Sequence, residues 1–105
     1  MLPRELRLSR EGFEQARGLK RAASQHFSLS YGPMEKGGTA VVISKKAAKL
    51  AVTRHLLKRR ILSVVRPYAR TDRALIVHVR PGASTLPFSE LKDELVSLIS
   101  STQVY

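Results

Sequence analysis

The chain has 105 residues, of which 43% are hydrophobic, and its 19 Lys and Arg against 8 Asp and Glu give a formal net charge of +11. This length and apolar content predict a single domain over residues 1–105 with a modest core, and exclude a disordered polycation. Because the chain has no cysteine, disulfides and thiolate metal sites are excluded. The sequence shows neither a signal peptide nor an apolar run of membrane-spanning length, so we expect a soluble, cytoplasmic protein.

The first half of the sequence predicts a short helix and two strands. Residues 9–18 begin with a capping serine and end with a glycine, as short helices do. Apolar and polar residues alternate over 25–31, which is the period of a half-buried strand. After a flexible turn at Gly37-Gly38, the apolar run at 39–44 predicts a strand buried on both faces. The stretch 19–23 is too weakly patterned to assign.

The middle of the sequence predicts a long helix with a basic face. Residues 45–60 contain seven Lys or Arg and no acid, and no Asp or Glu occurs between Lys36 and Thr71. Apolar residues at helical spacing form one stripe: Leu50, Leu57, Ile61 and Val64. Basic residues and a histidine project from the adjoining arc: Arg54, His55, Lys58, Arg59 and Arg66. We expect the helix to end at Pro67.

A strand and a second helix complete the predicted fold. Residues 74–79 are the clearest strand, and the helix that begins near Pro87 has Glu90, Asp93 and Glu94 towards its positive N-terminus. The strand, helix, strand order implies parallel neighbours, whereas the hairpin-like first half implies antiparallel ones. The sequence therefore predicts a mixed α+β sheet rather than a doubly wound one.

The acid-free basic helix predicts a polyanionic partner. A helix that is merely solvated usually mixes both signs and gains from Glu–Lys pairs four residues apart, which this helix lacks. Binding to an acidic membrane is a weaker alternative, because that role usually needs Trp or Phe on the apolar face, and the leucines here suit a core. Nucleic acid, contacted through its phosphates, is the favoured partner.

No group of residues predicts catalysis or a metal site. The pairs Glu11, Glu14 and Asp93, Glu94 lie on amphipathic helices, where carboxylates are ordinarily solvated. The three histidines lie far apart in the sequence and without metal-ligand spacing: His26, His55 and His78. We therefore expect no catalytic residue, no metal ligand and no tightly bound cofactor in the protein.

Several motifs resemble those of the bacterial ribonuclease P protein component. The run Ile43-Ser44-Lys45-Lys46, followed by Arg54-His55-Leu56-Leu57-Lys58-Arg59, resembles the signature of that family. The usual signature is a Ser/Ala-Lys-Lys strand end leading into Arg-Asn-Arg-x-x-Lys-Arg on a helix. The resemblance covers nearly the whole chain, from Leu2-Pro3 to the helix start at Phe88-Ser89-Glu90-Leu91.

The resemblance implies a mixed four-stranded sheet with packed helices, in the order α-β-β-β-α-β-α. It also implies a left-handed crossover through the basic helix, as in the ribosomal protein S5 domain 2-like fold. The implied function is that of the RNA-binding subunit of ribonuclease P, a hydrolase whose large RNA uses Mg²⁺ to remove the 5′ leader from precursor tRNA. Its implied partners are ribonuclease P RNA and precursor tRNA.

The resemblance also assigns roles to individual residues. Contacts with RNA are expected from seven residues: Lys45, Lys46, Lys49, Arg54, His55, Lys58 and Arg59. A cleft that holds the single-stranded leader would use Phe13, Arg17 and Tyr31.

The sequence departs from the family pattern at four positions. His55 and Leu56 stand where Asn and Arg are usual, so one amide and one guanidinium are missing. Arg17 and Ser30 stand where aromatic residues are common. We therefore expect leader binding to depend less on base stacking and more on charge.

Two other functions share some of these features. A structural RNA-binding protein of the ribosomal type would have the same size, charge and mixed fold, so charge does not distinguish it. The spacing of the signature and the full-length element order favour ribonuclease P. An independent nuclease is disfavoured by the shortage of acid–base groups.

Overall fold

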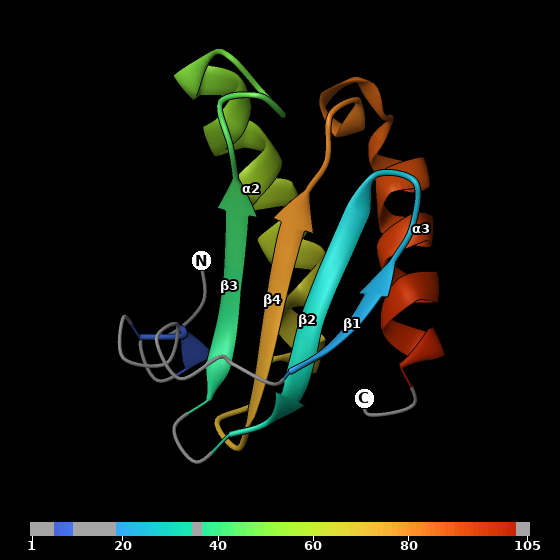
Figure 1. Cartoon of the computed structure of the whole chain (residues 1–105). Coiled ribbons are helices and arrows are strands. Elements are labelled where there is room, and N and C mark those ends of the chain that lie inside the picture. The colour runs from blue at the N-terminus through green and yellow to red at the C-terminus, as the bar shows by residue number, and fades with distance from the viewer. Residues whose placement is uncertain (1–5, 10–18, 35–36, 103–105) are drawn as a thin grey trace.

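The computed structural model describes residues 6–9, 19–34 and 37–102, which form a four-stranded sheet and two long helices (Figure 1). The strands are β1 (Lys20–Ala23), β2 (Phe27–Pro33), β3 (Gly38–Ile43) and β4 (Arg73–Val79). The helices are α2 (Ala51–Val65) and α3 (Phe88–Ser101). The short 3-10 turn η2 (Arg66–Tyr68) follows α2, and a second one, η3 (Ala83–Thr85), precedes α3. The helix expected over residues 9–18 falls, apart from Ser9, outside the described residues.

The sheet has the strand order β1-β2-β4-β3. β2 is antiparallel to both β1 and β4, whereas β3 is parallel to β4. The mixed α+β sheet predicted from the sequence is confirmed. β2 and β3 do not form the suggested hairpin, because β4 lies between them. β1 could not be assigned from the sequence, because its side chains are mostly exposed and show no apolar alternation.

The connection from β3 to β4 is left-handed. In Figure 1 both strands point upwards, β4 lies to the right of β3, and α2 lies behind the sheet. A chain that passes behind the sheet and returns on the right makes a left-handed crossover, whereas about 98% of such connections are right-handed. The handedness implied by the family resemblance is therefore present.

The core lies between one face of the sheet and the two helices. The strands β2 and β4 contribute alternate residues: Phe27, Leu29, Tyr31, Leu75, Val77 and Val79. The helices contribute the facing stripes: Leu57, Ile61, Val64 and Val65 from α2, and Leu91, Leu95, Leu98 and Ile99 from α3. None of these side chains is more than 9% exposed. Each large side chain buried in this way stabilises the fold by about 1.5–3 kcal/mol relative to exposure.

The strand β3 lies at the edge of the sheet, so the expectation that it is buried on both faces was wrong. Within the described ranges β4 is its one neighbouring strand, apart from a single bridge between Arg7 and Thr39. Val42 is 37% exposed on this edge. The apolar run at 39–44 did not indicate burial on both faces, because β-branched residues also suit a half-exposed pleated surface.

The pair Gly37-Gly38 permits close backbone packing rather than a flexible turn. A Cβ atom at Gly37 would overlap the backbone of Arg73, and one at Gly38 would lie 2.6 Å from the backbone nitrogen of Leu8. Any larger residue here would displace β3 from the start of β4 or from the N-terminal segment.

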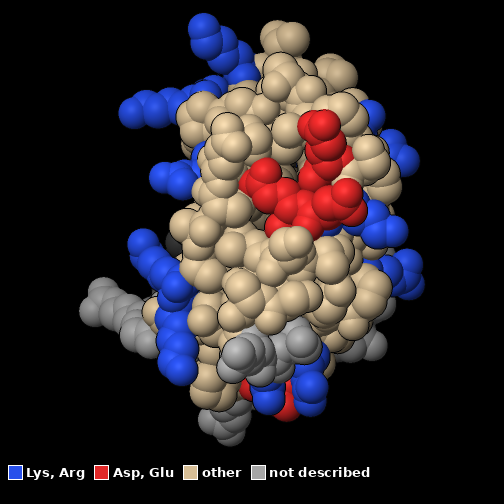
Figure 2. Space-filling model, turned by 90° about the vertical axis from the view of Figure 1, so that its right-hand side faces the viewer, with Lys and Arg blue, Asp and Glu red and all other residues tan. Residues whose placement is uncertain are grey.

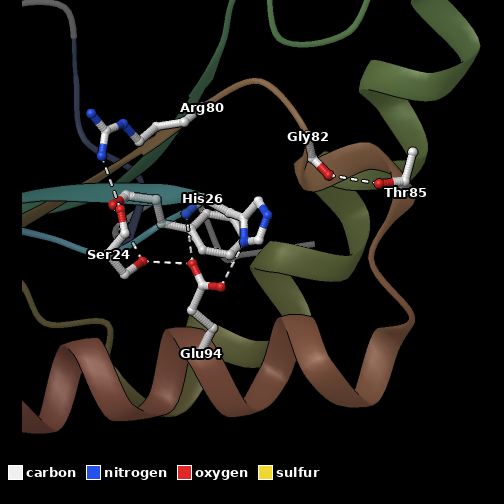
Figure 3. A network of polar contacts seen from close by, with 7 residues as sticks. Ser24, His26, Arg80, Gly82, Thr85 and Glu94 are labelled. Atoms are coloured by element: carbon white, nitrogen blue, oxygen red, sulfur yellow. Dashed lines mark hydrogen bonds and ion pairs between the residues drawn. The ribbon is translucent and has the colours of Figure 1, made fainter.

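A polar network joins α3 to the turn between β1 and β2 (Figure 3). Glu94 Oε2 accepts hydrogen bonds from Ser24 Oγ at 2.6 Å and from the backbone N–H of His26 at 2.8 Å. Glu94 Oε1 lies 2.8 Å from His26 Nδ1, and Arg80 donates to the Ser24 carbonyl at 2.9 Å. The sequence indicated only that Glu94 suits the early part of a helix, because its partners are about 70 residues away.

The environment of Glu94 favours its ionised form. Burial raises the pKa of this carboxyl, but hydrogen bonds from His26 and Ser24 outweigh burial and hold the pKa below its usual value of 4.5. A lowered pKa in the folded state stabilises the protein above the unfolded-state pKa, and that stabilisation is lost as the pH falls through the folded-state value. The network therefore weakens in acid, below a pH of 4.5.

We predict that Glu94→Gln lowers the free energy of unfolding at neutral pH by about 1–3 kcal/mol, because a charged acceptor of several hydrogen bonds becomes neutral. The difference from the wild type should shrink in acid, where the wild-type carboxylate is itself protonated. Urea unfolding from about pH 3 to about pH 7 measures both effects. The control is Asp93→Asn, an exposed neighbour on α3. An equal loss of stability in both variants would contradict the importance of the network.

Candidate nucleic-acid interface

The basic segment is a turn followed by a helix, not one continuous helix. Residues 45–47 form a turn, residues 49–50 a bend, and α2 begins only at Ala51. Lys45 and Lys46 are exposed in the turn, whereas Ala47 and Ala48 are 6% and 5% exposed. The two buried alanines anchor the turn, which is why the helix does not extend back to residue 45 as the sequence predicted.

Hydrogen bonds hold this turn at both ends. The backbone N–H groups of Ala47 and Ala48 each donate to the Ser44 carbonyl at 3.1 Å, and Ser44 Oγ accepts from Ala47 at 3.2 Å. At the other end, Arg54 Nη1 donates to the carbonyls of Ala48 and Lys49, at 2.9 Å each. The Arg54 guanidinium therefore contacts the backbone of its own chain.

The apolar stripe of α2 begins at Leu57, not at Leu50 as predicted. Leu50 is 69% exposed, and Val52 and Leu56 are 79% and 46% exposed. Figure 1 shows the reason: the first turns of α2 lie beyond the tip of β3, where the sheet does not cover them.

One side of α2 carries a hollow lined by cationic side chains. The hollow has a volume of about 650 Å³, and among the described residues it is lined by His55, Lys58, Arg59, Leu62, Ser63 and Arg66. A smaller hollow of about 190 Å³ lies where α2 meets β3, lined by Val41, Ile43, Arg54, His55 and Lys58. The structure thus gathers four of the predicted RNA contacts on the helix, whereas Lys45, Lys46 and Lys49 precede it.

Arg66 belongs to this surface, although the predicted set of contacts omitted it. It lines the larger hollow together with Arg59, seven residues earlier. Seven residues are about two helical turns, and helical spacing in the sequence already places Arg66 on the same arc as Arg59. Leu62 and Ser63 contribute apolar and hydroxyl surface between the cations.

Acidic residues are segregated from the cations of α2. Three of the described acids lie on α3: Glu90, Asp93 and Glu94. Figure 2 shows acids gathered in one patch on that side, with Lys and Arg projecting around its margins. In the part of the chain that the structure describes, no ion pair joins an acid to the cations of residues 45–66. The exposed lysines and arginines among them can approach an external anion, whereas Arg54 donates to backbone carbonyls.

The start of α2 adds to the positive potential. Its N-cap residue, Leu50, makes no side-chain capping bond, and its first turn holds no acid. The positive end of the helix dipole is therefore added to the charges of Lys45, Lys46 and Lys49 without local compensation. Such repulsion in the free protein would be relieved by a bound polyanion.

Of the three residues predicted for a leader cleft, Tyr31 is the one that lies within the described residues. Phe13 and Arg17 lie outside the described residues. Tyr31 is 9% exposed and belongs to the core, on the opposite face of β2 from Ser30. Its ring is enclosed between sheet and helices and is not available for base stacking, so we correct that assignment.

The other face of the sheet is polar near the end where β2 begins and β4 finishes. Ser28 of β2 and His78 of β4 are cross-strand neighbours there. Burial lowers the pKa of His78, and the nearby positive charge of Arg21 lowers it further. The imidazole is therefore neutral at pH 7 and can donate or accept a hydrogen bond.

Neither a metal site nor a membrane-spanning helix occurs among the described residues. No three His, Cys, Asp or Glu side chains within 6–9, 19–34 and 37–102 are grouped to hold a metal ion. None of the helices in these ranges has the length and apolar character needed to cross a membrane.

Comparison with known proteins points to one family. The family model described as ribonuclease P matches residues 2–103. A curated relative, the ribonuclease P protein component of Cyanothece sp., is 31% identical over 67 residues, which are 61% of this chain and 51% of the relative. The match therefore spans about half the length of that relative.

Solved structures of RNase P proteins share the fold. A mutant of the Staphylococcus aureus protein superposes with a TM-score of 0.81 at 18% identity, covering 95% of this chain and 90% of that one. The Thermotoga maritima protein gives a TM-score of 0.72 at 20% identity, covering 91% and 94%.

We predict that Lys58→Ala weakens the binding of structured RNA, because Lys58 is exposed and lines both hollows. Loss of one phosphate contact should reduce the slope of log affinity against log salt by about 0.7–0.9. Titrations at several salt concentrations measure the slope. Lys92→Ala removes the same charge from the acidic side of the molecule and should leave the slope unchanged. Equal changes in both variants would mean that net charge alone matters.

Proposed function

Because this chain belongs to the ribonuclease P protein family, we propose that it is the protein subunit of ribonuclease P. In this role it assists a catalytic RNA in the endonucleolytic removal of the 5′ leader from precursor tRNA. The hydrolysis and its Mg²⁺ ions belong to the RNA, and the protein supplies cations that hold the two RNAs together. The observation that carries the proposal is the acid-free cationic surface of α2 and its preceding turn, in a chain matched by the family model over residues 2–103.

The cationic surface binds phosphates in two places, along the helix α2 and beside the turn that precedes it. Lys58 and Arg59 on α2 bind phosphates along the helix, and Lys45 and Lys46 bind them beside the turn. A lysine ammonium acts as a compact point charge, whereas an arginine guanidinium can hold a phosphate through two parallel hydrogen bonds. Leu56 replaces a usual arginine and is 46% exposed, so it offers apolar surface to a base or ribose at this point.

A structural protein of the ribosomal type is the weaker candidate. It would explain the charge and the mixed sheet equally well. The family match over nearly the whole chain favours the ribonuclease P subunit.

We predict that the protein lowers the magnesium concentration at which a bacterial ribonuclease P RNA removes the leader, because protein cations offset the repulsion between RNA phosphates. The measurement is the rate of leader release over a magnesium series, with and without the protein. A Lys58→Ala, Arg59→Ala double variant should shift the requirement less. An unchanged magnesium requirement together with unchanged substrate affinity would refute the proposal. Cleavage by the protein without any RNA subunit would favour an independent nuclease.

We predict a leader-specific effect of Phe13→Ala if this ring stacks on a leader base. The loss should be about 1–3 kcal/mol in affinity for precursor tRNA with a leader of several nucleotides, and mature tRNA should bind as before. If Phe13 is instead a core residue, the variant should lose about 3–5 kcal/mol of folding stability and affect all RNAs alike. Denaturant unfolding distinguishes the two. A stable variant with equal losses for both RNAs would exclude stacking.

A further inference from the structure

Within the described part of the chain, Arg54 differs from the other cations of the interface because its guanidinium is hydrogen-bonded to the protein's own backbone. We propose that Arg54 is a positioning residue that holds the lysine turn, residues 44–49, against the start of α2. In this role it presents Lys45, Lys46 and Lys49 to RNA as one rigid group and makes no essential phosphate contact of its own. The inference rests on the proposed RNA-binding function and assigns a specific role within that surface.

The geometry of Arg54 is that of a cross-link. Its Nη1 atom lies 2.9 Å from the carbonyl oxygens of both Ala48 and Lys49, six and five residues earlier in the chain. Its own backbone N–H donates to the Leu50 carbonyl at 3.0 Å, within the first turn of α2. Two consecutive carbonyls of the turn are thereby joined to the helix through one side chain.

The turn needs this restraint at its C-terminal end. The bonds to Ser44 hold only its beginning. At the other end, Leu50 provides no side-chain cap and the first turn of α2 has no acid. Three lysines and the positive end of the helix repel one another there, which weakens a turn that is otherwise anchored by the buried Ala47 and Ala48.

A cation at a helix N-terminus is ordinarily unfavourable, because the helix dipole is positive at that end. Hydrogen bonds from a charged donor to two carbonyls offset this cost. The same bonds use both N–H groups of Nη1, so a phosphate could be held only through the remaining donors, Nε and Nη2. These bonds suit a residue that contributes to RNA binding by positioning the three lysines of the turn.

A thermodynamic cycle separates positioning from direct contact. If Arg54 binds its own phosphate, its contribution adds to that of the lysines, whereas a residue that acts through the lysines has no effect once they are removed. The affinity of a bacterial ribonuclease P RNA is therefore measured for four proteins. These are the wild type, Arg54→Ala, the triple variant Lys45→Ala, Lys46→Ala, Lys49→Ala, and the combination of all four changes.

We expect Arg54→Ala to weaken binding about tenfold in the wild-type background and less than about twofold in the triple variant. Lys58→Ala is the matched control and should cost the same factor in both backgrounds. An equal cost of Arg54→Ala in both backgrounds would overturn the proposal.

Hydrogen exchange in the free protein tests the restraint without RNA. The amides of Ala47 and Ala48 report on the turn, and Arg54→Ala should accelerate their exchange about 5- to 30-fold, while Lys58→Ala leaves it unchanged. Unchanged exchange in Arg54→Ala would also overturn the proposal. Failure of the wild type to bind the RNA would refute the proposed function instead, and the exchange rates would still decide whether Arg54 holds the turn.

Discussion

Parallel pairing of β3 with β4 determines where the cationic surface lies. Parallel neighbours cannot be joined by a tight turn, so the chain must return along a face of the sheet, and α2 makes that return. The helix buries Leu57, Ile61, Val64 and Val65 in the core and leaves Lys58 and Arg59 exposed. Because Lys58 and Arg59 lie on this helix, the pairing of two strands sets the direction in which the cations point.

The acids that stabilise the fold and the cations that attract a polyanion lie on different sides of the molecule. The described acids lie mainly on α3, where Glu94 holds the β1–β2 turn through Ser24 and His26. The cations around α2 have no such partners in the described part of the chain, and their mutual repulsion costs folding free energy. The core between sheet and helices must outweigh that cost in the free protein. Separating the charges in this way leaves one surface strongly attractive to a polyanion.

The departures from the family signature fall where the structure leaves side chains exposed. His55 lines both hollows, and Leu56 is 46% exposed on the uncovered start of α2. Neither change disturbs the core, so the fold accommodates both. On the other face of the sheet, Ser28 and the neutral His78 provide hydrogen-bonding groups in a place where no aromatic ring of β2 is available, since Tyr31 points into the core.

The sequence by itself determined the mixed α+β class, the buried stripe from Leu57 to Val64 and the location of the cations, because periodicity and charge are local properties of the chain. Its motifs also identified the family. Only the tertiary structure decided the insertion of β4 between β2 and β3, the start of α2 at Ala51, and the enclosure of Tyr31. It also assigned the partners of Arg54 and Glu94. These features depend on which distant segments meet and on how far the sheet extends beneath the helix, and no local pattern of residues encodes either.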